Sequence, residues 1–189
     1  MKKLVVAITG GSGVIYGIKL LKYLNQLNLE THLILSEWGA KTIRIETNAD
    51  PNLLKSLATF HYDNNNMAAS ISSGSFKTDG MVIIPCSMKT LSSITHGFDD
   101  SLISRSASVC IKEHRKLVIV PRETPLSTIH LENMLKLSEM NVTILPAMPG
   151  FYSKPSSIDD LISHIVGKVL DQFDINHNMY KRWGQEKLV

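Results

Sequence analysis

The sequence predicts an α/β fold, a doubly wound parallel sheet with helices on both faces. Short aliphatic runs recur along the chain, and longer segments with helical spacing separate them. No internal repeat or low-complexity segment interrupts this alternation. Because 189 residues with 43% hydrophobic side chains can bury a core of their own, we expect residues 1–189 to form a single domain.

The expected strands are five short runs that are apolar throughout, as strands covered on both faces are. They comprise residues 4–9, 31–36, 81–87, 117–121 and 142–148. In 14–27 and 158–173, apolar residues recur at steps of three and four, which places them on one face of a helix. The polar stretch "HYDNNNMAAS" (61–70) is expected to be a surface connection.

Composition argues against several classes of function. The net charge of +3 is too small to indicate nucleic-acid binding, and no apolar run approaches the ~20 residues of a membrane span. Cys86 and Cys110 are too few and too far apart for a disulfide framework, and the seven histidines lack metal-binding spacing. We therefore expect a cytoplasmic protein with no metal, no nucleic-acid partner and no membrane anchor.

The turn "GGSG" (10–13) follows the first expected strand, at the edge where ligands bind parallel sheets. It does not match the dinucleotide pattern G-x-G-x-x-G, because Tyr16 stands where the third glycine belongs. What remains is a Gly/Ser turn that opens a helix. Its N–H groups and the Ser12 hydroxyl could hold a phosphate, or its glycines could serve only a tight turn. Both interpretations stay open.

The stretch "PCSMKT" (85–90) follows the third expected strand. No histidine is tied to Cys86 by a local motif, so a small buried cysteine is favoured over a nucleophile. Ser87, Lys89 and Thr90 lie at an expected helix start. There they could donate to an anion or to the carbonyls of a heteroaromatic ring.

Arg122 and Glu123 follow the fourth expected strand, between Pro121 and Pro125. They could form a surface ion pair. Alternatively, because neighbouring side chains point in different directions, one could hold a phosphate while the other acts as an acid or base. The two prolines restrict the backbone, as a preorganised site requires.

Arg105 and Lys112 lie seven residues apart in an expected helix, on roughly the same face. They could converge on one anion, although a solvated charged face is the commoner role for such residues.

Nine motifs in register closely resemble the UbiX-type flavin prenyltransferases over almost the whole chain. They include "ITGGSGVIYG", "MVIIPCSMKTLSSITHG", "VPRETPLSTIHLENM", "MPGFYSKPSSIDDL" and "RWG". The resemblance implies a single-domain Rossmann-like (flavodoxin-like) fold. It also implies transfer of a dimethylallyl group from dimethylallyl monophosphate to reduced FMN, without a metal. The product would serve a separate UbiD-type decarboxylase, and the enzyme would be a homododecamer with sites at subunit contacts.

The resemblance also implies roles for individual residues. Glu123 and Lys112 would be catalytic, with Glu123 as the acid or base. Tyr152, Lys168 and Arg105 would bind the prenyl phosphate. The residues expected to contact FMN are Gly10, Gly11, Ser12, Ser36, Cys86, Ser87, Met88, Lys89 and Arg122.

The chain departs from the family pattern at two positions. Lys168 stands where arginine is more usual, which keeps the charge and loses the bidentate fork. Met67 stands where some relatives have a tryptophan. Trp183 could steady an allyl cation or serve as a C-terminal anchor, and the tail (174–189) is expected to dock on a neighbouring subunit.

Two alternative functions remain. One is a non-catalytic FMN-binding accessory subunit of an aromatic acid decarboxylase, which would leave the set of Lys112, Glu123, Tyr152 and Lys168 unexplained. The other is a flavin-dependent cysteine decarboxylase of the same fold, whose PXMNXXMW-like segment is missing here.

Overall fold

The computed structural model describes residues 2–184. Within them, one sheet of six parallel strands has the order β3-β2-β1-β4-β5-β6. The strands are β1 (Lys3–Ile8), β2 (Glu30–Leu35), β3 (Phe60–Asp63), β4 (Gly80–Cys86), β5 (Lys116–Pro121) and β6 (Thr143–Ile144). Strand order reverses between β1 and β4, and in open parallel sheets such a switch point is where ligands bind.

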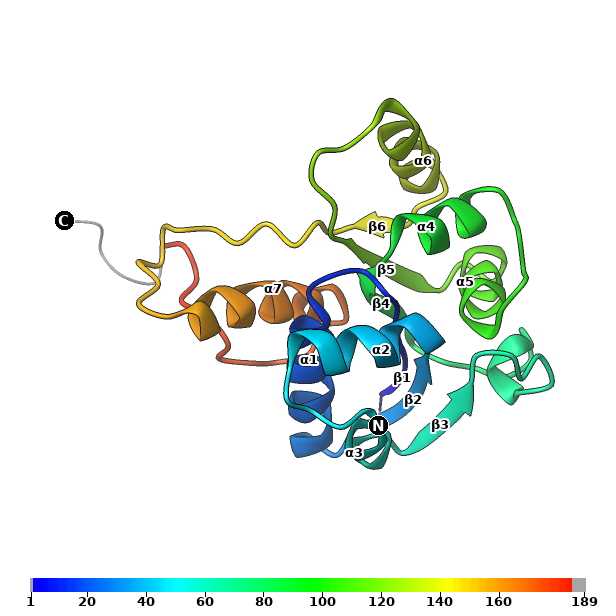
Figure 1. Cartoon of the computed structure of the whole chain (residues 1–189), viewed down its shortest axis with the longest axis horizontal. Coiled ribbons are helices and arrows are strands. Elements are labelled where there is room, and N and C mark those ends of the chain that lie inside the picture. Colours follow the sequence, from blue (N-terminus) through cyan, green and yellow to red (C-terminus); the bar gives the residue numbers. More distant parts are fainter. Residues whose placement is uncertain (1, 185–189) are drawn as a thin grey trace.

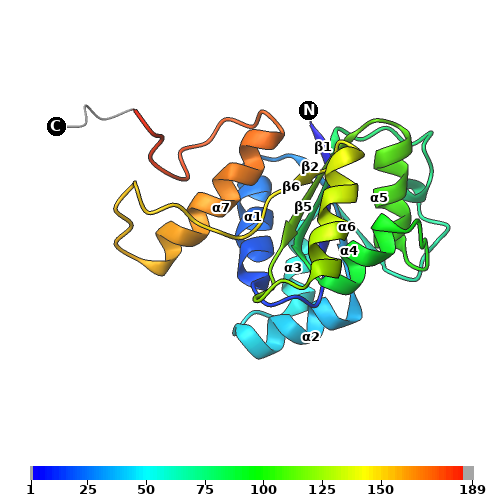
Figure 2. The same cartoon turned by 90° about the horizontal axis from the view of Figure 1, so that it is seen from above.

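Helices cover both faces of the sheet, which confirms the doubly wound prediction. Figure 2 shows α1 and α7 on one side of the strands and α4, α5 and α6 on the other. The helices are α1 (Val14–Gln26), α2 (Glu37–Glu46), α3 (Pro51–Leu57), α4 (Met88–Thr95), α5 (Leu102–Lys112), α6 (Thr128–Glu139) and α7 (Ile158–Gln172). No helix in residues 2–184 is long and apolar enough to cross a membrane.

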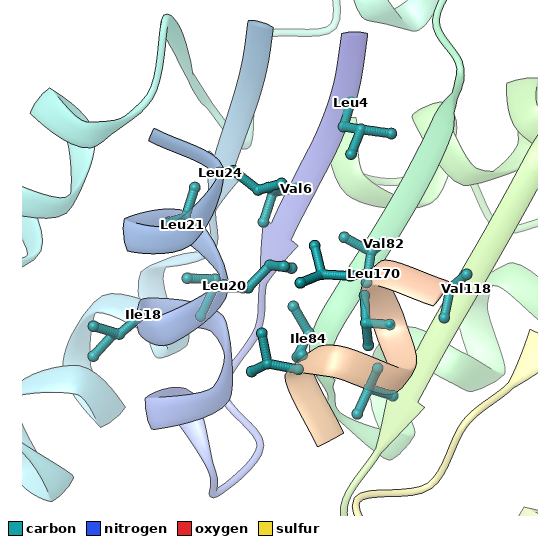
Figure 3. Close-up of a cluster of buried hydrophobic side chains, with 14 of the residues drawn as sticks. Leu4, Val6, Ile18, Leu20, Leu21, Leu24, Val82, Ile84, Val118 and Leu170 are labelled. Atoms are coloured by element: carbon teal, nitrogen blue, oxygen red, sulfur yellow. The ribbon is translucent and has the colours of Figure 1, made fainter. Parts of the chain in front are cut away.

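Alternate residues of each central strand enter two separate cores. Val6 and Val82 pack with α1 and α7 on one face, as Figure 3 shows. Ala7 and Ile83 point to the other face, under α4 and α5. Because both faces are covered, these strands need apolar residues at every position, and their continuous apolar runs predicted them correctly.

The prediction of a connection at 61–70 was wrong at its start, since 60–63 form the edge strand β3. Phe60, His61 and Asp63 are exposed there, because β3 has a strand on one side only. The run 142–148 pairs as β6 only at Thr143 and Ile144. Pro146 has no N–H to donate, although Leu145 N and Ala147 N still bond to carbonyls of β5.

Candidate active site

A cleft of about 1040 Å³ opens at the carboxyl edge of the sheet. This volume is at the upper end of the ~300–1,000 Å³ typical of ligand and cofactor pockets. Residues that follow β1, β2, β3 and β4 line it, including Thr9, Gly10, Ser36, Asn64, Ser87, Lys89 and Thr90. Three of the strand ends that the sequence singled out therefore meet at one cleft large enough for a flavin.

The "GGSG" turn leads from β1 into α1 at this edge. Gly13 has a φ of 98°, a left-handed conformation that favours glycine, and it precedes the first helical residue. A side chain on Gly10 would place its Cβ 2.6 Å from Trp38 Cβ, so Gly10 is needed for close packing against α2. The tight-turn interpretation is therefore correct at Gly13, whereas Gly10 is required by packing. Gly11 lies against Pro85 and Ser87, and the Ser12 carbonyl faces Arg122.

Glu46, at the end of α2, occupies part of the anion site predicted for this turn. Its Oε2 accepts hydrogen bonds from Gly13 N (2.9 Å) and Val14 N (3.2 Å). A carboxylate is favoured there because the N–H groups and dipole of α1 point at it. A phosphate bound to this turn would then use Gly11 and Ser12. Sequence reasoning missed Glu46, which lies 33 positions beyond Gly13 in a helix with no motif.

Two serines cap the helices that begin at the cleft. Ser36 Oγ accepts a hydrogen bond from Gly39 N (2.9 Å) in α2. Ser87 Oγ accepts one from Thr90 N (3.4 Å) in α4, which confirms the predicted helix start. A capping serine keeps its own proton as a donor, and helix N-termini favour anions. These helix starts therefore offer donors to a flavin phosphate or to ring carbonyls.

The residues on either side of Ser87 have different environments. Cys86 is fully buried, and burial raises the pKa of its thiol, so it remains a protonated, unreactive thiol as expected. Met88 is half-buried and packs against the core under α4. Lys89 is exposed and pairs with Asp100 at 3.0 Å.

Arg122 and Glu123 lie at the carboxyl end of β5, and both are exposed. Their side chains diverge, as predicted for neighbours. Arg122 Nε donates to the Ser12 carbonyl (3.3 Å), while the Glu123 carboxylate accepts from Thr124 N (3.2 Å). Arg122 thus joins this corner to the "GGSG" turn, and the Glu123 carboxylate remains accessible from solvent.

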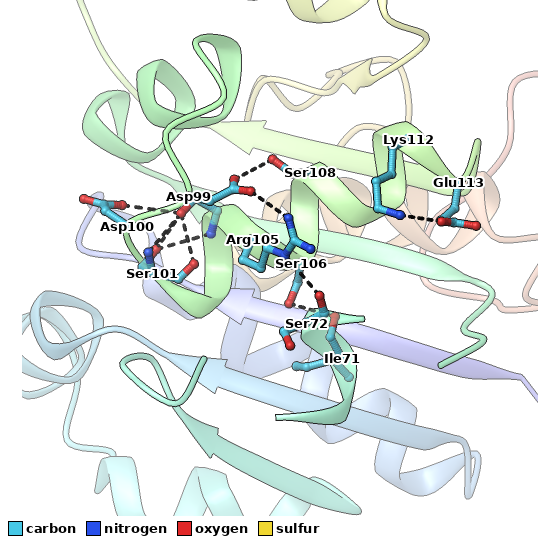
Figure 4. A network of polar contacts seen from close by, with 11 residues as sticks. Ile71, Ser72, Asp99, Asp100, Ser101, Arg105, Ser106, Ser108, Lys112 and Glu113 are labelled. Atoms are coloured by element: carbon cyan, nitrogen blue, oxygen red, sulfur yellow. Dashed lines mark hydrogen bonds and ion pairs between the residues drawn. The ribbon is translucent and has the colours of Figure 1, made fainter. Parts of the chain in front are cut away.

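Arg105 and Lys112 do not converge within one chain. Arg105 pairs with Asp99 (3.2 Å) and donates to the Ser72 carbonyl (3.1 Å), as Figure 4 shows. Lys112 lies at the other end of α5 and pairs with Glu113 at 2.6 Å. The seven-residue spacing places Arg105 and Lys112 on roughly the same face of α5, but each side chain pairs with a different carboxylate.

Lys112 also lies at the wrong edge of the sheet to reach Glu123 in the same chain. It ends α5, and β5 begins at Lys116 only four residues later, at the amino edge. Glu123 follows the carboxyl end of β5. The 11 residues of α5 span roughly 16 Å, so no side-chain rotation closes this gap.

Tyr152 and Lys168 lie in a third region, formed by the loop before α7, by α7 itself and by the chain after it. This part extends away from the sheet in Figure 1. Tyr152 Oη is 3.3 Å from His164 Nε2. Lys168 Nζ is 3.8 Å from the Asp171 carboxylate and 6.0 Å from the ring centre of Tyr180.

The chain after α7 folds back on the same helix and is fixed there by Asp171. The Asp171 carboxylate accepts from His177 Nε2 (3.1 Å) and from the Tyr180 hydroxyl (2.5 Å). Arg182 Nη2 adds a third bond at 2.6 Å. A Cβ on Gly167 would overlap the Tyr180 ring, so this glycine makes room for the returning chain. Docking of the tail on a neighbouring subunit stays a prediction, and 185–189 lie outside the described residues.

Asp171→Asn should destabilise the protein in a pH-dependent manner. Burial raises the pKa of Asp171, but its three hydrogen bonds outweigh burial and hold the pKa at about 2. Because this pKa lies below that of the unfolded chain, the carboxylate stabilises the fold above about pH 4. This contribution is lost as the pH falls toward 2. We expect a loss of about 1–2 kcal/mol in the free energy of unfolding at pH 7, and a smaller loss at pH 3.

Urea denaturation of both proteins at pH 7 and pH 3 measures this difference. Asp174→Asn is a matched control, because Asp174 is exposed and its left-handed backbone (φ 52°) suits asparagine equally well. An Asp171→Asn deficit of the same size at both pH values would show that the charge is not what stabilises the tail.

No group of three or more His, Cys, Asp or Glu in residues 2–184 is arranged to hold a metal ion. The doubly wound sheet and the cleft at its switch point define an α/β protein that binds a nucleotide-like cofactor or substrate.

A family model described as Flavoprotein matches residues 1–170. The chain is also similar to a probable UbiX-like flavin prenyltransferase of Escherichia coli O157:H7, with 52% identity over 96% of this chain and 92% of that protein.

The flavin prenyltransferase LpdB of Lactiplantibacillus plantarum is 52% identical over 97% of this chain and 98% of its own. Among solved structures, AnUbiX (PadA1) in complex with FMN and dimethylallyl pyrophosphate superposes with a TM-score of 0.96. It has 49% identity and covers 98% of this chain and 99% of that one. The chain belongs to the flavoprotein family and, within it, to the UbiX-like flavin prenyltransferases.

Two further solved structures are similar to the chain. The dodecameric FMN-dependent Ubix-like decarboxylase from Escherichia coli O157:H7 has a TM-score of 0.94 and 52% identity, over 96% of this chain and 98% of that one. The peptidyl-cysteine decarboxylase EpiD has a TM-score of 0.62 and 20% identity, over 79% and 83%. The second likeness extends to the fold alone.

Proposed function

We propose that this protein is a flavin prenyltransferase that moves a dimethylallyl group from dimethylallyl monophosphate to reduced FMN. The observation that carries the proposal is the 49% identity, over 98% of the chain, to a protein whose crystal structure contains FMN and dimethylallyl pyrophosphate. In this reaction the allylic carbon–oxygen bond breaks and phosphate leaves with the bonding electrons. The reduced flavin supplies the electrons for a first bond to carbon. The prenyl double bond then takes up a proton, and a second atom of the flavin bonds to the resulting cationic carbon and loses its own proton, so that the isoalloxazine gains a fourth ring.

FMN is a substrate here, and the cleft at the switch point fits it. Ser36 and Ser87, which cap α2 and α4, line this space together with Gly10 of the turn before α1. We assign the FMN contacts to Gly10, Gly11, Ser12, Ser36, Cys86, Ser87, Met88, Lys89 and Arg122. Cys86 would contribute through its backbone, because its thiol is buried.

The prenyl phosphate is assigned to Tyr152 and Lys168. A hydroxyl donor and an ammonium group there would stabilise charge as it builds on the leaving phosphate. Lys168 has a compact charge where arginine would offer a planar fork, so it would hold the phosphate by charge rather than by paired hydrogen bonds. Glu123 would serve as the acid or base for the proton that the flavin loses on ring closure.

The enzyme is proposed to act as a homododecamer in which Arg105 and Lys112 reach the site from a neighbouring subunit. Two observations support this arrangement. Lys112 and Glu123 lie at opposite edges of the sheet in one chain, and a relative with 52% identity is dodecameric. Trp183 is 68% exposed beside Tyr152, at a ring-centroid distance of 5.4 Å, and would close the site or contact a neighbour.

The product would be passed to a UbiD-type decarboxylase in the cytoplasm. Cys86 and Cys110 both support a reducing compartment, since both are free and buried. Burial raises the pKa of Cys110 to about 12, so neither thiol is poised to react.

Release of inorganic phosphate from dimethylallyl monophosphate tests the transfer directly. We expect release only with reduced FMN, in a one-to-one ratio with flavin consumed, because only the reduced ring has the electrons to attack the allyl group. Oxidised FMN is the matched control. Tight binding of FMN without phosphate release would favour an accessory flavin-binding subunit. Decarboxylation of a cysteine peptide by oxidised FMN enzyme would favour a cysteine decarboxylase.

A further inference from the structure

His164 lies in α7 beneath the loop that carries Tyr152, and it is only 8% exposed. Its two ring nitrogens face two different groups of that loop. Gly150 N–H points at Nδ1 (3.4 Å), and Nε2 lies 3.3 Å from Tyr152 Oη. The imidazole therefore ties both the backbone and a side chain of this loop to the helix.

The direction of these contacts assigns the tautomer of His164. The Gly150 N–H can only donate, so Nδ1 accepts and carries no proton. In a neutral imidazole the proton is then on Nε2, which donates to the phenol oxygen of Tyr152. The Tyr152 hydroxyl proton takes no part in this contact and can point toward a ligand.

We propose that His164 is a positioning residue that holds the phenol oxygen of Tyr152, so that the Tyr152 hydroxyl proton faces the phosphate of the prenyl donor. This inference rests on the proposed function, which makes Tyr152 a phosphate ligand. If the hydrogen bond ran in the opposite direction, the Tyr152 hydroxyl would donate its proton to His164 Nε2. Tyr152 would then show the anionic phosphate only lone pairs, which repel it. Hydrogen bonds to ionised oxygens are roughly twice as strong as neutral ones, so the direction of this single proton matters.

The groups around His164 keep it neutral. Burial lowers the pKa of His164, and the charge of Lys168 one turn along α7 lowers it further, while Asp171 opposes both effects. Tyr152 and Tyr180 complete its surroundings with ring contacts rather than charge. A protonated imidazole would carry hydrogen on both nitrogens and could not accept at Nδ1.

The rings also fix the plane of Tyr152. Its ring centre is 5.7 Å from that of His164 and 5.4 Å from that of Trp183, both in edge contact. Tyr180 packs against His164 with ring centres 4.9 Å apart. Such edge-to-face contacts are favourable, so the phenol is oriented by its neighbours as well as by its hydrogen bond.

His164→Asn and His164→Gln form a matched pair that separates the two hydrogen bonds. An asparagine amide reaches about as far as Nδ1 and can still accept from Gly150 N–H, but it does not reach Tyr152. A glutamine amide reaches about as far as Nε2 and can donate to Tyr152. The primary measurement is calorimetric binding of dimethylallyl monophosphate to enzyme loaded with oxidised FMN, which lacks the electrons for transfer.

We expect His164→Asn to weaken donor binding about tenfold, with FMN affinity unchanged, and His164→Gln to keep most of it. Tyr152→Phe should cause a similar loss. In the Tyr152→Phe background, His164→Asn should add little, because His164 acts through the hydroxyl that is already gone. His96→Gln, at an exposed histidine that ends α4, controls for a general effect of losing an imidazole.

Additive losses in the double variant would overturn the proposal, as would wild-type donor binding by a folded His164→Asn enzyme. Equal losses from Asn and Gln would also overturn it, since the Tyr152 contact would then not be the one that matters. If the wild-type enzyme does not bind dimethylallyl monophosphate, Tyr152 has no phosphate to bind and the proposal fails. The proposed function would fail by itself if the donor binds, and the variants lose binding as expected, but reduced FMN is not prenylated.

Discussion

Glu123→Gln should retain FMN binding and lose about 100- to 10,000-fold in kcat, the range that general acid–base catalysis contributes. The amide cannot accept the proton that ring closure releases. It can still accept the Thr124 N–H bond that the carboxylate now makes at 3.2 Å, so the corner after β5 keeps its shape. Steady-state turnover with reduced FMN, together with fluorescence titration of oxidised FMN, measures the two effects separately.

Glu139→Gln is the matched control, because Glu139 is an exposed carboxylate at the end of α6. Loss of FMN binding by Glu123→Gln, at unchanged thermal stability, would contradict its assignment as acid or base. It would instead make Glu123 a flavin ligand.

Mixed oligomers of Lys112→Ala and Glu123→Gln chains should recover activity that neither variant has alone. Each parent oligomer should lose at least about 100-fold, because one substitution removes a positive charge near the leaving phosphate and the other removes the acid or base. If Lys112 reaches the site from a neighbour, about a quarter of the sites in a random mixture combine an intact Glu123 with an intact Lys112. Co-expression with two tags and sequential purification isolates the mixed species.

A mixture of wild-type chains with chains that carry both substitutions gives the control. Sites shared between subunits predict about a quarter of wild-type activity here as well, whereas sites built within one chain predict about half. Inactive oligomers from the two single variants, with half activity in this control, would show that Lys112 acts within its own chain.

The sequence was sufficient for the parts of the fold that are governed by burial. The central strands are apolar at every position because both faces are covered, so their runs mark them clearly. β3 has no such signature, since an edge strand with exposed Phe60 and His61 resembles a polar connection. β6 is a regular strand only at Thr143 and Ile144, although Leu145 N and Ala147 N still bond to β5, so an apolar run does not reveal where regular pairing ends.

Residues of the candidate site could be predicted only where they directly follow the end of a strand. The "GGSG" and "PCSMKT" stretches and the Arg122–Glu123 pair could be assigned to one edge because parallel strands end together. Glu46 and His164 could not, because each meets its partner through the packing of a helix against a distant turn or loop. Lys112 shows the opposite case. Its charge and its place in the family pattern are evident from the sequence, but only the position of α5 places it at the far edge from Glu123.

The most direct test is anaerobic. Purified protein is mixed with reduced FMN and dimethylallyl monophosphate, and the mass of the released flavin is measured. A gain of one five-carbon prenyl unit, formed far more slowly when the protein is replaced by Glu123→Gln, is the result expected of a flavin prenyltransferase. Unchanged FMN that nevertheless co-purifies with the protein would contradict that function and would leave a flavin-binding subunit without transferase activity.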